Sequence, residues 1–137
     1  MRREDWPERL AMFVAGARSR AFAWGAWDCT TFADGAIEAV TGAARFEDLR
    51  GGYDSAAGAL AHLRDVLGVP DLPAALDLRL PRRAVPFARR GDLMAFAAGL
   101  DALPALGVST GPLAAVLAAE GITVRPAAEA LIAWGVD

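Results

Sequence analysis

The chain contains 137 residues, of which 55% are hydrophobic and 23% are charged, and its formal net charge is −3. This length and composition are typical of one globular domain with its own hydrophobic core, and they exclude general disorder. The slightly acidic balance gives no indication of a nucleic-acid partner, and the single cysteine excludes an internal disulfide and a cysteine-built zinc site. No apolar stretch reaches the roughly 18 uninterrupted residues of a membrane span, and the charged N-terminus lacks the apolar run of a secretion signal.

Helices are predicted for the first part of the chain, about residues 5–80. One begins at Asp5-Trp6-Pro7, because proline is tolerated in a first helical turn. Another, over Ser55–Leu67, has Asp54 as its predicted N-cap and carries His62 on the flank of its apolar stripe. Its expected core face is Ala56, Leu60, Leu63 and Leu67. A short helical turn within Leu72–Leu80 and a basic connector over Pro81–Pro86 follow.

The helix that contains the only cysteine has the clearest local signals. Asp28 is a good N-cap, and Gly42 suits the left-handed position that ends a helix. Apolar residues recur between them with the spacing of one helical face: Cys29, Phe32, Ala33, Ala36, Ile37 and Val40. Cys29 therefore lies in the first turn, where partial positive charge lowers a thiol pKa and favours a nucleophile. The alternative is a small buried hydrophobe, since the Asp28 carboxylate opposes thiolate formation.

Short strands are predicted for the second part of the chain, about residues 89–137. Glycine, proline and charged residues separate the apolar runs, and Asp92 reads as a turn residue at the entry to the first strand. The expected strands are Leu93–Phe96, Ala105–Thr110, Leu113–Ala118, Ile122–Arg125 and Leu131–Val136. Helices followed by a compact antiparallel sheet place the chain in the α+β class.

The order of these motifs resembles the NlpC-type cell-wall peptidases, which are papain-like cysteine hydrolases that cut the peptide stems of peptidoglycan. The resemblance rests on Asp28-Cys29 at a helix start, Arg90-Gly91-Asp92-Leu93 before a strand, and a strand with Leu106-Gly107-Val108. The chain is also similar to short phage and prophage proteins encoded among tail genes, through an ordered set of motifs between Trp24 and Trp134. These resemblances imply one papain-like NlpC-type domain over residues 1–137, with N-terminal helices packed on a small antiparallel sheet and Cys29 at the nucleophile position.

The sequence departs from the NlpC pattern at the catalytic base. The resemblance places the base histidine at the start of a strand, where Ala105 stands here, and the chain has no Asn or Gln to orient a histidine. His62 is the only histidine and is a candidate base, although a lone helical histidine also suits a solvated or packing role. A cysteine without a base loses general acid–base assistance worth roughly 10²–10⁴-fold in rate.

The two resemblances, taken together with the missing base, imply three alternative functions. In the first, the chain is a structural component of a tailed-phage or phage-derived tail tip or baseplate, with a vestigial Cys29. In the second, it is an active cysteine peptidase or amidase that cleaves peptidoglycan stem peptides during cell-wall penetration, with Cys29 as the nucleophile and His62, or an atypical group, as the base. In the third, it binds wall peptides without cutting them. None of the three calls for a cofactor or a metal.

Large aromatic and cationic side chains are the candidate interface residues. Trp and Arg are over-represented at interface hot spots, and the candidates are Trp24, Trp27, Arg82, Arg83 and Trp134. A core role for the tryptophans and a solvated face for the arginines are the alternatives. The expected partners are other tail-tip or baseplate proteins, with peptidoglycan as a further candidate, and neither nucleic acid nor membrane. The resemblance implies a location in the virion tail after assembly in the host cytoplasm.

Overall fold

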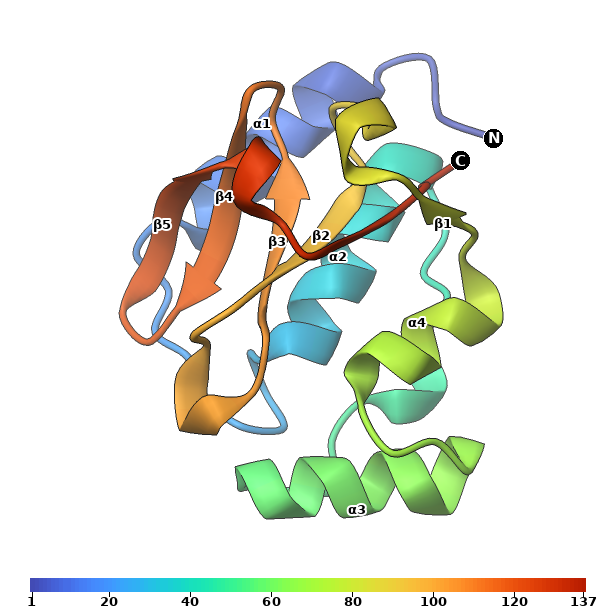
Figure 1. The fold of residues 1–137 in the computed structure, drawn as a ribbon, viewed down its shortest axis with the longest axis vertical. Helices are drawn as coiled ribbons and strands as arrows, with labels where there is room; N and C mark the ends of the chain where they lie inside the picture. Colours follow the sequence, from blue (N-terminus) through green and yellow to red (C-terminus); the bar gives the residue numbers. More distant parts are fainter.

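A computed structural model describes residues 1–137 and shows an α+β fold, as the sequence predicts. The helices are α1 (Trp6–Ala17), α2 (Cys29–Thr41), α3 (Ala56–Leu67) and α4 (Leu72–Arg79). The strands are β1 (Arg82–Arg83), β2 (Leu93–Phe96), β3 (Ala105–Ser109), β4 (Leu113–Ala118), β5 (Gly121–Pro126) and β6 (Ile132–Trp134). They form one antiparallel sheet in the order β1-β6-β2-β3-β4-β5 (Figure 1).

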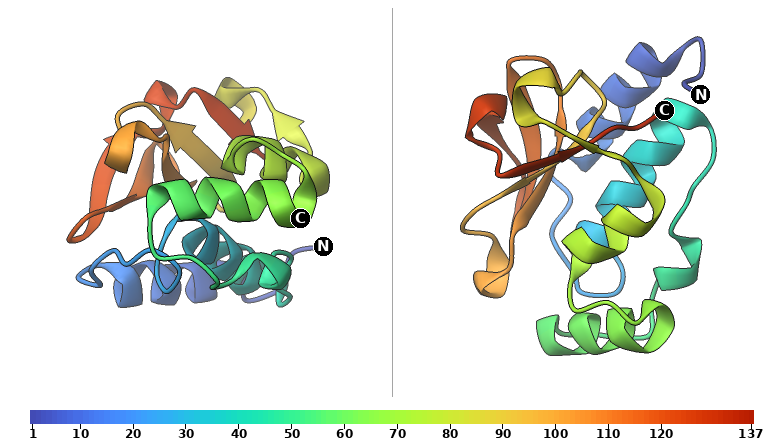
Figure 2. Two further views of the ribbon diagram at one scale, coloured as in Figure 1. Left: turned by 90° about the horizontal axis from the view of Figure 1, so that it is seen from below. Right: turned by 45° about the vertical axis from the view of Figure 1, so that its right-hand side comes forward.

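Both faces of this sheet are covered, so the central strands are buried along their whole length. Helices α1 and α2 pack on one face, as Figure 2 shows, and the main core lies between them and the sheet. On the other face, the short 3-10 helices η2 (Val85–Phe87) and η4 (Ala127–Glu129) flank a smaller core. Alternate residues of β2 divide between the two cores, since Leu93 and Ala95 belong to the first and Met94 and Phe96 to the second.

Helix α2 begins and ends where its sequence predicts. The Asp28 carboxylate accepts from the backbone N–H groups of Thr30 and Thr31, while the Thr31 hydroxyl accepts from the Asp28 N–H, which completes a capping box. Gly42 ends the helix with a left-handed φ of 86°. The main core contains Phe32, Ala33, Ala36, Ile37 and Val40, as predicted.

Helix α3 differs from its prediction in two ways. Its N-cap is Ser55, whose hydroxyl accepts from the Gly58 N–H at 3.0 Å, and not the adjacent Asp54. Of its predicted core face only Leu63 is buried, because α3 lies at the edge of the molecule, where it packs on α4 and the 3-10 helix Glu47–Leu49 (Figure 1). The predicted short turn after it is the eight-residue helix α4.

The basic stretch Pro81–Pro86 is more ordered than a connector. Arg82 and Arg83 form strand β1, whose backbone pairs with Trp134 and Ala133 of β6. A two-residue strand at a sheet edge has no period of its own, so its pairing depends on a segment about 50 residues further along the chain.

Two further buried aspartates fix loops that lie far apart in the sequence. Asp34 on α2 accepts from the backbone N–H groups of Arg45 and Phe46, at 2.7 and 2.9 Å, and pairs with the Arg50 guanidinium. Asp92, predicted as a strand-entry turn residue, does accept from the Arg89 N–H. Its side chain is also fully buried and binds the guanidinium groups of Arg2 and Arg83. Since the chain has neither Asn nor Gln, carboxylates supply these loop acceptors.

Candidate functional site at Cys29

A small apolar pocket lies at the N-terminus of α2, between the sheet and helices α3 and α4. Cys29 and Thr30 contribute from α2, Leu60 and Leu63 from α3, and Leu106 from β3. The remaining lining residues are Trp24, Asp28, Tyr53, Ala59, Asp71, Leu72, Pro73, Ala95, Leu103 and Pro104. Its cavity volume is about 50 Å³. One water molecule needs roughly 10–15 Å³ of cavity volume, so the pocket is the size of a few waters.

Asp28, beside the cysteine, is committed to holding the backbone around the pocket. Its Oδ1 accepts from the two helix N–H groups, and its Oδ2 accepts from the Gly25 N–H at 2.9 Å and from the Tyr53 hydroxyl at 2.5 Å. The carboxylate is 1% exposed. Asp28 is thus the helix cap that the sequence predicts, and it also ties the loop before α2 to the loop before α3.

Tyr53 belongs to the stretch Arg50-Gly51-Gly52-Tyr53, whose two glycines predict a turn that lets the backbone approach another surface closely, but the sequence gives its side chain no role in the site. Burial and the hydrogen bond to Asp28 raise the pKa of its phenol well above the usual range. The backbone carbonyl of Tyr53 lies so close to Gly25 that a Cβ on Gly25 would stand 2.1 Å from its oxygen. The sequence shows an aromatic residue at this position, but it does not show the hydrogen bond to Asp28, which lies 25 residues earlier in the chain.

The environment of Cys29 overturns the prediction of a lowered thiol pKa. Burial among apolar side chains and, to a smaller extent, the negative charge of Asp28 together raise the pKa of Cys29 to about 12, although a hydrogen bond with the Leu106 backbone opposes this in part. The favourable partial charge of a helix N-terminus is worth about 0.3–1 kcal/mol, whereas desolvation of a buried charge shifts a pKa by up to several units. Desolvation therefore wins, and the thiol is protonated at neutral pH.

The strand opposite Cys29 presents a leucine and not a base. Ala105, where the NlpC resemblance places the histidine, belongs to the small core on the other face of the sheet, together with Met94 and Phe96. Leu106, one residue further on, lines the Cys29 pocket. Alternation along a strand explains the difference, since adjacent side chains point to opposite faces.

His62 is not among the residues that line the Cys29 pocket. Its ring packs against the Tyr53 ring, with 5.3 Å between the ring centroids. Its Nε2 is buried without a hydrogen-bond partner, so the structure offers it no relay toward the thiol. Tyr53 lies between His62 and Asp28, because its ring packs against His62 and its hydroxyl donates to Asp28.

The candidate interface residues divide between the core and intramolecular pairs. Trp134 is fully buried and Trp27 is 7% exposed, so both are core residues, and the indole of Trp134 donates to Asp77 at 2.8 Å. Arg82 makes a bidentate pair with the same Asp77. Arg83 is bound to two aspartates described below. Of the three candidate tryptophans, Trp24 is the one that stays partly exposed, where it packs against Phe22 and lines the pocket, and Arg82 keeps an exposed side chain despite its pair with Asp77.

One wall of the pocket is a loop with unusual backbone conformations. Leu103 and Pro104 line the pocket from the segment that joins β2 to β3. In the same segment Ala98, Asp101 and Ala102 all have positive φ, of 61°, 53° and 62°. A left-handed conformation costs an L-residue other than glycine about 1–2 kcal/mol, so this loop stores strain beside the pocket.

Comparison with known proteins places the chain in a family. The family described as "Domain of unknown function (DUF6950)" matches residues 1–136, and the chain belongs to it. No curated protein and no solved structure matches the chain. No group of three His, Cys, Asp or Glu side chains is arranged to hold a metal ion, and none of the helices has the length and apolarity to cross a bilayer.

Proposed function

We propose that this chain is a non-catalytic structural component of a phage or phage-derived tail tip or baseplate, built on a papain-like, NlpC-type fold. The arrangement of α2 supports the fold assignment, because the N-terminus of this helix and its cysteine face strands β2 and β3 of an antiparallel sheet. Fold alone does not imply function, so the functional part of the proposal depends on the site itself.

The observation that carries the proposal is the state of the Cys29 thiol. Burial holds its pKa at about 12, and Leu106 stands on the facing strand. At neutral pH a thiol of this kind is protonated in all but a minute fraction of molecules, and the thiolate is the nucleophile. The Asp28 carboxylate and the Tyr53 hydroxyl bind each other, which leaves Asp28 occupied as an acceptor. Cys29 is only partly buried by its exposed area, and it packs against the main core with Leu63 and Leu106 as neighbours in the pocket.

An active peptidase is the competing function, and it would require two changes in the structure. The strained loop over Leu103 and Pro104 would have to open, and the thiol would have to gain a base that now lies elsewhere. Both changes would have to accompany substrate binding. No contact in the structure favours this sequence of events over the scaffold function.

The proposal is tested in the phage or prophage whose genome encodes the chain. Purified particles should contain the chain in a fixed ratio to the other tail proteins, as measured by quantitative mass spectrometry. Deletion of the gene should yield defective tails, and a gene carrying Cys29→Ala should restore infectious particles as well as the wild-type gene does. Complete, infectious particles that lack the chain would contradict a structural role, and failure of Cys29→Ala alone would point to the peptidase.

A further inference from the structure

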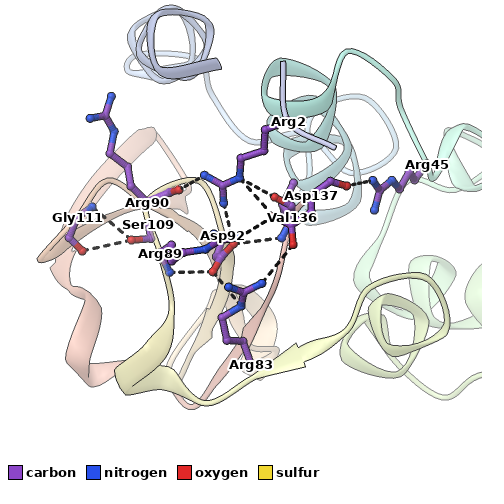
Figure 3. Close-up of polar contacts among 10 residues, drawn as sticks. All are labelled: Arg2, Arg45, Arg83, Arg89, Arg90, Asp92, Ser109, Gly111, Val136 and Asp137. Carbon is purple, nitrogen blue, oxygen red and sulfur yellow. Dashed lines mark hydrogen bonds and ion pairs between the residues drawn. The ribbon is translucent and has the colours of Figure 1, made fainter. Parts of the chain in front are cut away.

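Four arginine side chains from four separate segments meet around Asp137 (Figure 3). The Arg89 guanidinium donates to Asp137 Oδ1 at 2.7 Å, and Arg2 Nε lies 3.6 Å from the same oxygen. Arg83 contacts Asp137 Oδ2 at 3.3 Å, and Arg45 donates to the Asp137 main-chain oxygen. These arginines come from the N-terminal segment, β1, the turn before β2 and the loop after α2.

Positive charge exceeds negative charge among the side chains of this cluster. Three guanidinium groups, those of Arg2, Arg83 and Arg89, face two side-chain carboxylates, those of Asp92 and Asp137, while Arg45 binds only the Asp137 main-chain oxygen. Asp92 is fully buried, whereas the Asp137 side chain is 51% exposed. The carboxylate that a solute can replace is therefore that of Asp137. Burial lowers the pKa of Arg2, and repulsion from Arg89 and Arg83 lowers it further, although Asp92 and Asp137 act against this.

Two of the arginines are fixed in place before any ligand arrives. Asp92 Oδ1 accepts from Arg2 at 3.0 Å, and Asp92 Oδ2 lies 3.4 Å from Arg83 Nε. Arg2 also donates to the main-chain oxygens of Val136 and Arg90, at 2.8 and 2.5 Å. Their side chains are only 14% and 24% exposed, so little side-chain entropy remains to be lost on binding.

We infer that Arg2, Arg83 and Arg89 form a docking site for an aspartate or glutamate side chain of a partner protein, and that the Asp137 side chain occupies this site until the partner displaces it. The observed occupant is itself an aspartate side chain, so a carboxylate fits the directions in which these guanidinium groups point. Arginine suits this use because its planar fork binds carboxylate oxygens in defined geometry. Under the proposed function the partner is a neighbouring tail subunit; only that identity rests on the proposal above.

The test is a titration of the purified chain with an acidic peptide, Gly-Asp-Glu-Asp-Gly with blocked ends, followed by NMR on the arginine Nε–Hε signals. Asp137→Asn removes the competing charge, so it should tighten binding about tenfold relative to wild type. Adding Arg89→Ala to Asp137→Asn should weaken binding again by a similar factor. Arg82→Ala, which removes an exposed arginine bound to Asp77 instead, is the matched control and should change nothing.

Two outcomes would overturn the inference. Binding to Asp137→Asn that is no tighter than to wild type would mean that Asp137 is not a displaceable occupant. Equal binding of the amide peptide Gly-Asn-Gln-Asn-Gly, or tighter binding of inorganic phosphate, would mean that the site does not select a carboxylate. Because the titration uses the chain alone, its result does not depend on whether the chain enters phage particles.

Discussion

The single cysteine allows the raised thiol pKa to be measured by the rate of alkylation. Burial in the folded chain is the main reason that the pKa of Cys29 rises from 9.0 to about 12. Three pKa units reduce the thiolate fraction at pH 7.5 about 1000-fold, and alkylation by iodoacetamide follows that fraction. The folded chain should therefore react about 10³-fold more slowly than the same chain unfolded in guanidinium chloride.

A relocated thiol provides the control for this measurement. The double variant Cys29→Ala, Ala57→Cys moves the only thiol to an exposed position on α3, where it should react almost as fast as in the unfolded chain. A folded wild-type chain that reacts within about tenfold of the unfolded rate, or whose rate has a midpoint near pH 7, would refute the argument from desolvation. Such a midpoint would instead describe an activated nucleophile.

Three further predictions concern stability. Asp92→Asn should lower the free energy of unfolding in urea by about 3–5 kcal/mol, because it leaves buried Arg2 without its carboxylate, whereas the exposed Asp101→Asn should change it by less than about 0.5 kcal/mol. Between pH 9 and 10 stability should fall by up to about 1.4 kcal/mol per pH unit through Cys29, since the unfolded thiol ionises there while the folded one keeps its proton to about 12; Cys29→Ala should remove this part of the slope, whereas Tyr53 adds a slope of the same sign above pH 10. Ala98→Gly should raise the melting temperature because φ is positive there, and Ala84→Gly, at φ −60°, should lower it.

Each of these three predictions would be contradicted by a different result. Equal effects of the two aspartate substitutions would mean that the buried cluster adds nothing to stability. A slope between pH 9 and 10 that survives Cys29→Ala would assign it to a group other than the thiol. A loss of stability in Ala98→Gly as large as in Ala84→Gly would mean that the loop carries no left-handed strain.

The sequence predicts those features that depend on neighbouring residues. The start of α2 at Asp28 and its end at Gly42 need only a cap residue and a glycine in the right places, and both predictions are confirmed. Strands β2 and β4 were predicted with their observed bounds, because each is a continuous apolar run between turn residues. The prediction of Asp54 as the cap of α3 is wrong, because Ser55 beside it is an equally good capping residue and takes that position.

Features that depend on distant segments could not be predicted. Strand β1 exists because β6 lies beside it, and Asp92 is buried because Arg2, Arg83 and the end of the chain converge on it. The pKa of Cys29 is raised by walls that α3, α4 and the loop after β2 supply, whereas the sequence displays only the helix N-terminus beside it. The missing base was predicted at Ala105, but strand alternation places Leu106 toward the thiol.

The measurement that tests the central claim most directly is the release of soluble peptides from purified peptidoglycan by wild type and by Cys29→Ala, at equal folded content. A non-catalytic scaffold predicts no release above buffer from either protein, because the Cys29 thiol is protonated and faces Leu106. Release by wild type that disappears in Cys29→Ala would contradict the claim and establish a cysteine peptidase whose pocket opens on its substrate.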